Sequence, residues 1–161
     1  MKRIIIACIA SVIICVLCAS CAEKPINIDV RELSDYIGKE IDLSNTVEYD
    51  DIQIKTNFGI DSEDVKQIIV LRELKSNSAE MIIFAQAADS SKAQEIKEKL
   101  NKIKEYNLAQ LKDYTANPDN AQQYYIVENS EVWTEQDYVF WAVNSRSENI
   151  DAMIKNYIKN N

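Results

Sequence analysis

Histidine, glycine and cysteine are scarce in this sequence, and their scarcity limits its chemistry. The 161 residues include no histidine, two glycines and four cysteines, all four within the first 21 residues. Without histidine the chain lacks the commonest general base and the commonest metal ligand. Gly38 and Gly59 are too few and too far apart for a phosphate-binding loop, which needs several neighbouring glycines. We therefore predict a non-catalytic protein with no catalytic residue, no metal and no cofactor.

The first twenty residues are typical of an export signal. Met1-Lys2-Arg3 is basic, and an uncharged apolar run of 14 residues follows at positions 4–17. Spanning a bilayer takes about 20 apolar residues, whereas the apolar region of a signal peptide has roughly 7–15. Residues 1–20 are therefore predicted to be a signal peptide.

A lipidation motif follows this run. The segment Cys18-Ala19-Ser20-Cys21 resembles a lipobox, although Cys18 stands where leucine is usual. The resemblance implies that a diacylglyceryl thioether forms on Cys21, which becomes the new N-terminus, and that two acyl chains make a stable anchor. An ordinary secretory signal and an uncleaved membrane anchor are the alternatives. If Cys21 is lipidated, the protein is extracytoplasmic and lipid-anchored to the cell membrane, with residues 21–28 as a tether.

Processing at Cys21 would leave an acidic chain with one cysteine, and that sulfur would carry the lipid. No disulfide is then possible. Loss of Lys2 and Arg3 leaves 16 basic and 26 acidic residues, a net charge of −10. Because such a chain is repelled by phosphates, we predict no nucleic-acid partner. Residues 29–161 have the length of a single domain.

The hydrophobic pattern after the tether predicts an α+β fold. Two apolar hairpins, each followed by an amphipathic helix, form a ββα-ββα order. This order predicts a four-stranded antiparallel sheet with helices packed on one face, preceded by one or two N-terminal helices. Ser91 and Ser147 are the predicted caps of the two later helices. The predicted strands are 67–73, 80–85, 125–133 and 138–143; the predicted helices are 29–38, 50–59 (which also suits a strand), 91–116 and 147–158, with a loop at 117–120.

Three short segments resemble a family of small bacterial lipoproteins that is catalogued only as a domain of unknown function. They are Phe58-Gly59-Ile60-Asp61-Ser62-Glu63-Asp64-Val65, Ile82-Ile83-Phe84 and Asp137-Tyr138-Val139. The resemblance covers about residues 29–145. The family is common in Gram-positive bacteria, so the resemblance implies display at the cell surface and no known activity.

Aromatic and acidic residues supply the candidate sites. Tyr125, Trp133, Tyr138 and Trp141 either belong to the core or form an exposed patch that binds an envelope protein or glycan. The acidic group of Asp50, Asp51, Asp61, Glu63 and Asp64 either caps helices and turns or binds calcium, although it lacks the glycine spacing of a calcium loop.

These observations favour a membrane-tethered, non-catalytic interaction domain of the cell envelope. Its partners would be membrane lipid, through Cys21, and an envelope protein or glycan. The alternatives are a small-ligand receptor, with a pocket between sheet and helices, and a carboxylate-based hydrolase.

Replacing Cys21 with serine tests the anchor. We expect the wild-type protein to enter the detergent phase on phase partitioning of cell extracts and the Cys21→Ser variant to leave it, because serine cannot form the thioether. A variant that remains membrane-bound at full length would contradict the lipid anchor.

Overall fold

A five-stranded antiparallel sheet forms the centre of the part of the protein that the computed structural model describes, residues 24–75, 78–112 and 117–161. The strand order is β1-β2-β3-β5-β4. The strands are β1 (Thr46–Glu48), β2 (Val65–Glu73), β3 (Met81–Ala87), β4 (Val132–Glu135) and β5 (Tyr138–Val143).

Both predicted hairpins are present, and the second lies beside the first. Strands β2 and β3 pair directly, as do β4 and β5. Strand β5 then pairs with β3 over its whole length, from Met81↔Val143 to Gln86↔Tyr138. The predicted count of four strands is wrong because β1 adds a fifth. This strand has only three residues, fewer than the four to eight over which an alternating pattern indicates a strand.

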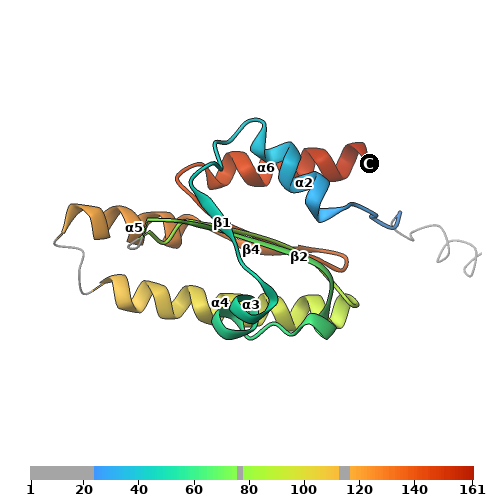
Figure 1. Ribbon diagram of the computed structural model, residues 1–161, viewed down its shortest axis with the longest axis horizontal. Coiled ribbons are helices and arrows are strands. Elements are labelled where there is room, and N and C mark those ends of the chain that lie inside the picture. Colours follow the sequence, from blue (N-terminus) through green and yellow to red (C-terminus); the bar gives the residue numbers. More distant parts are fainter. Residues whose placement is uncertain (1–23, 76–77, 113–116) are drawn as a thin grey trace, which may run out of the picture.

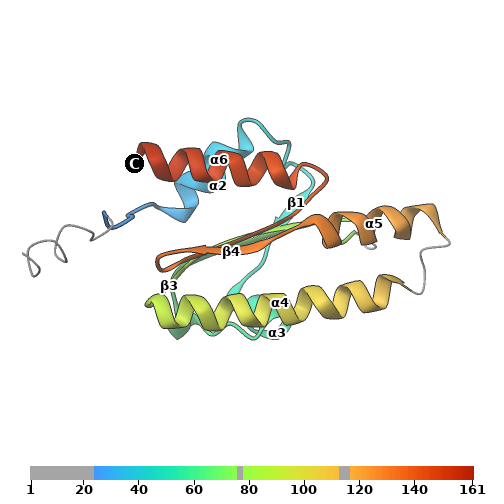
Figure 2. The same ribbon diagram turned by 180° about the vertical axis from the view of Figure 1, so that it is seen from behind.

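Helices cover both faces of the sheet, as Figures 1 and 2 show. Helices α2 and α6 lie on one face, and α3 and α4 lie on the other. The two helices that follow the hairpins, α4 and α6, lie on opposite faces, so the prediction that both lie on one face is wrong. Strands β3 and β5 are apolar on both sides, and each side is covered by helices. The helices are α2 (Val30–Gly38), α3 (Asp51–Phe58), α4 (Ser90–Lys112), α5 (Pro118–Asn129) and α6 (Ser147–Asn160), with a 3₁₀ turn η1 (Ser62–Asp64).

Helix α5 corrects the predicted strand at 125–133 and the predicted loop at 117–120. The Asn117 side chain accepts a hydrogen bond from the backbone N–H of Asp119 (2.9 Å), and Pro118 is the first helical residue. An asparagine cap followed by proline favours the start of a helix as much as a loop. Tyr125 consequently lies on a helix, and only Val132–Glu135 is strand.

The caps of the two later helices also differ from prediction. Asp89, and not Ser91, caps α4, since its Oδ1 accepts from the backbone N–H of Lys92 at 2.8 Å. Ser147 is the first residue of α6 and is buried, and no side chain caps that helix. Asp29, where the first helix was predicted to begin, caps α2 and accepts from the N–H groups of Arg31 and Glu32.

Two side chains of the β4–β5 hairpin hold the segment that was predicted to be a tether. The Gln136 amide accepts from Ile26 N–H and donates to Lys24 C=O, both at 2.8 Å. The Tyr138 hydroxyl accepts from Ile28 N–H and donates to Ile28 C=O, both at 3.0 Å. Residues 24–28 are therefore attached to the domain. Cys21 lies outside the described residues.

Within the described residues, no helix combines the length and apolar character that crossing a membrane requires.

Tyr138→Phe tests the attachment of residues 24–28. Both backbone groups of Ile28 would lose a buried partner, so we expect the free energy of unfolding to fall by about 1–3 kcal/mol. Chemical denaturation measures the change. The matched control is Tyr125→Phe, at an exposed tyrosine, which should change stability by less than about 0.5 kcal/mol. Equal effects of the two substitutions would contradict the role given to the Tyr138 hydroxyl.

Candidate functional site

The four aromatic residues singled out from the sequence do not form one surface. Tyr138 and Trp141 are fully buried, Trp133 is 8% exposed, and only Tyr125 is largely exposed, at 64%. Trp141 packs on the α4 side of the sheet, whereas Trp133 and Tyr138 pack on the α2–α6 side. Trp133, Tyr138 and Trp141 therefore belong to the core, and of the four residues a partner would reach only Tyr125.

Each buried indole also has its own internal hydrogen-bond partner. Trp141 Nε1 donates to Ser130 Oγ, and Trp133 Nε1 donates to Asp151 Oδ1, both at 3.0 Å. Buried aromatic N–H groups normally find such partners, so these contacts indicate structural roles.

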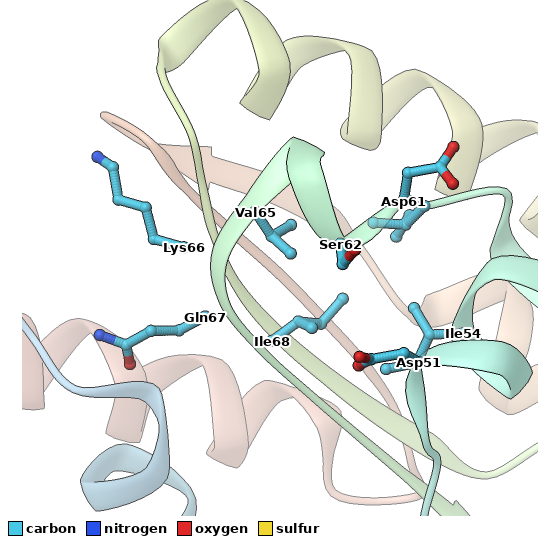
Figure 3. Close-up of a pocket in the computed structure, with 9 residues that line it drawn as sticks. Asp51, Ile54, Asp61, Ser62, Val65, Lys66, Gln67 and Ile68 are labelled. Atoms are coloured by element: carbon cyan, nitrogen blue, oxygen red, sulfur yellow. The ribbon is translucent and has the colours of Figure 1, made fainter.

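A groove lies instead beside the first half of strand β2, between α3 and the segment that leads into η1 (Figure 3). Its volume is about 230 Å³. The residues that line it are Asp51, Ile54, Ile60, Asp61, Ser62, Val65, Lys66, Gln67 and Ile68. The prediction from sequence did not find this groove, because its walls come from three elements that are separated by turns.

Local sequence signals place the wall that α3 contributes. Asp50 and Gln53 form a reciprocal capping box, which starts the helix. Gly59 ends it with a φ of +64°, a left-handed conformation that glycine adopts without strain. The chain then turns back toward β2, with Ile60 buried and Asp61 paired to Lys55 at 2.5 Å.

The 3₁₀ turn at the end of the groove is fixed to α4 by Asp64. This buried carboxylate pairs with Lys92 at 2.9 Å and with Lys99 at 3.4 Å. Its backbone carbonyl accepts from Ala88 N–H, and Lys99 also donates to the Gly59 carbonyl at 2.7 Å. Hydrogen bonds from Lys92, and then from Lys99, lower the pKa of Asp64 below its usual value.

The groove has an apolar floor and an acidic rim. Ile54 and Ile60 are buried, and Val65 and Ile68 are half-buried. Lys66 extends away from the groove, and its ammonium bonds the Asp137 carboxylate at 2.8 Å. The Asp51 carboxylate lies on the side of α3 that faces Ile68 in Figure 3.

Two carboxyl groups, those of Asp151 and Glu80, have a raised pKa. Burial raises the pKa of Asp151, which the indole N–H of Trp133 partly opposes. Burial also raises the pKa of Glu80, and the charge of Glu73 raises it further. Glu73 and Glu80 share a cavity of about 80 Å³, far below the roughly 300–1,000 Å³ of typical ligand pockets.

The acidic residues around α3 and η1 serve the fold individually. Asp50 caps α3, Asp61 pairs with Lys55, and Asp64 pairs with two lysines. In the part of the chain that the structure describes, no three histidine, cysteine, aspartate or glutamate side chains converge as metal ligands.

Asp64→Asn tests how the groove is supported. At neutral pH we expect the variant to be less stable by about 1 kcal/mol, because the charge-assisted bonds to two lysines weaken. The pKa of Asp64 is lower in the folded protein than in the unfolded chain, where it is about 3.9. The ionised carboxylate therefore stabilises the fold fully above about pH 3.9, and this stabilisation is lost as the pH falls through the folded-state pKa. Stability curves of both proteins between pH 7 and pH 2 should therefore converge at acidic pH. A pH-independent difference would contradict the ionic role.

Comparison with known proteins places the groove within a recognised domain. Residues 39–144 match the family described as Domain of unknown function (DUF4358). No curated protein and no solved structure matches the chain. The match includes every residue that lines the groove, whereas α2 and α6 lie outside it. Since the match covers well over half of the sequence, the chain belongs to the DUF4358 family.

Proposed function

We propose that this protein is a membrane-tethered, non-catalytic binding domain of the cell envelope, anchored through Cys21, and that the groove beside β2 is its binding surface. The observation that carries this proposal is the groove itself, a concave surface with an apolar floor beside a strand that its neighbour covers only in part. Concave surfaces that combine apolar side chains with placed polar groups are common binding sites. The partner would be an envelope protein.

The attachment of residues 24–28 supports a position close to the bilayer. Three residue steps separate Cys21 from Lys24, and each step spans at most about 3.6 Å, so the lipid-bearing residue would lie within roughly 11 Å of Lys24. Gln136 and Tyr138 then fix the following residues to the sheet. A domain held this close to the membrane meets envelope partners rather than freely diffusing ones.

The size of the groove favours a macromolecular partner over the small-ligand receptor. Its volume of about 230 Å³ is below the roughly 300–1,000 Å³ of pockets that enclose small ligands. The carboxylate-based hydrolase has less support, because the cavity shared by Glu73 and Glu80 is smaller still.

Photo-crosslinking from the groove tests the proposal in cells. A photoreactive amino acid at Ser62, an exposed groove residue, should give one dominant crosslinked product on denaturing gels. Mass spectrometry would identify the partner. The matched control places the same group at Tyr106, which is 64% exposed on α4 and does not line the groove. No product from Ser62, or the same products from both positions, would contradict the groove as the binding surface.

A further inference from the structure

We propose that the groove binds an extended segment of a partner polypeptide, which adds a strand to the open edge of β2 and places a basic side chain near Asp51. This inference rests on the proposed function and names the chemistry of the partner. It follows from three features that the described residues of the groove show: backbone groups of β2 that face no strand, an apolar floor, and an acidic side chain, Asp51, that forms no ion pair there.

Strand β1 covers only the end of β2. Its register runs from Thr46↔Glu73 to Glu48↔Leu71, and one further hydrogen bond joins Tyr49 N–H to the Val70 carbonyl at 2.9 Å. The chain then leaves the sheet and enters α3. Residues 65–69 of β2 therefore have β3 on one side and, among the residues that the structure describes, no strand on the other.

The open edge carries backbone groups that are oriented to pair. Along a strand, successive residues direct their N–H and C=O groups to opposite neighbours. Glu73 N–H bonds the Glu80 carbonyl on the β3 side, whereas the Val70 carbonyl and Leu74 N–H bond residues on the β1 side. Ile68, two residues before Val70, must then direct its N–H and C=O to the β1 side, beyond the end of β1. A partner's main chain would satisfy these groups, as in other complexes formed by strand addition.

The floor of the groove suits the alternating side chains of a strand. Ile54, Ile60 and Ile68 contribute to one apolar cluster on the α3–α4 side of the sheet. An added strand would direct every second side chain onto this floor and the others to the opposite face of the sheet. Residues 65–69 span at most about 17 Å at the usual rise of a strand, and the register of β2 shifts between Val65 and Gln67, so the paired segment would have at most about five residues.

The charge of the groove favours a basic partner segment. Two of its three ionic side chains are neutralised: Asp61 by Lys55, and Lys66 by Asp137. Asp51 makes no ion pair with any residue that the structure describes. A second copy of this chain would bring another Asp51 and a net charge of −8 to the same edge, and like charges side by side disfavour strand pairing. We therefore assign the groove to another polypeptide that carries lysine or arginine.

A displayed library of random seven-residue peptides, selected against the detergent-solubilised full-length protein, tests this inference. We expect the enriched peptides to alternate apolar and polar residues and to contain lysine or arginine. N-methylation of backbone amides at alternate positions should abolish binding in one register and leave it unchanged in the other, because only one register bonds to β2. Enrichment without that alternation, or no enrichment, would overturn strand addition.

Variants of the groove make the test specific. Ile68→Pro removes the N–H that faces the open edge and leaves the hydrogen bonds to β3 intact, and strands tolerate proline at such edge positions. We expect this substitution to weaken binding at least tenfold. Asp51→Asn should weaken binding of basic peptides about two- to fivefold, in line with a single exposed ion pair. The matched control is Glu105→Gln, an exposed acid on α4 that should leave affinity unchanged. Circular dichroism would show whether each variant is folded. If Ile68→Pro unfolds the protein, the effect of Asp51→Asn on binding is the test of the groove.

The two proposals fail in different ways. A crosslinked partner at Ser62 that the selected peptides do not displace would overturn strand addition and leave the groove as a binding surface. No crosslinked partner would overturn the proposed function itself. A free protein that is dimeric by light scattering, and becomes monomeric on Asp51→Lys or Ile68→Pro substitution, would assign the edge to a second copy instead.

Discussion

Burial of strands β3 and β5 on both faces is the constraint on which the rest of this structure depends. These neighbouring strands present Ile83 and Trp141 to one side and Phe84 and Phe140 to the other, and all four side chains are fully buried. An apolar face that is left in water costs roughly 25 cal/mol per Å², so each side requires a helical layer. Helix α4 provides one layer, and α2 with α6 provides the other.

Three of the four aromatic residues singled out from the sequence are buried by this arrangement, so they do not form an exposed patch. Trp141 fills the α4 side, while Trp133 and Tyr138 fill the side of α2 and α6. Tyr138 also fixes the entry of the chain through its hydroxyl, so one side chain serves both core and attachment. At the edge of the sheet, β1 is shorter than its neighbour β2. The chain leaves β1 for α3, and the groove lies beside the half of β2 that β1 does not cover.

The predictions from sequence succeeded where local signals were strong. Asp29 caps the first helix, Gly59 ends the second, and the two runs of β-branched residues form the β2–β3 hairpin. They failed where one signal had two meanings. Asn117-Pro118 starts a helix and was assigned to a loop, and the apolar residues after Tyr125 include the end of that helix. The groove could not be predicted, because Asp51, Ser62 and Ile68 come together only through the crossover from β1.

The sequence by itself determined the α+β class, the two hairpins and most helix boundaries, because capping and periodicity act between residues that are close along the chain. It also limited the chemistry, since a chain without histidine and with two glycines lacks the parts of many common sites. Only the tertiary structure decided which aromatic side chains are buried, which face each helix covers and where the sheet stays open. Those outcomes depend on the pairing of β3 with β5 and on the short reach of β1, and such contacts between distant residues leave no local pattern to recognise.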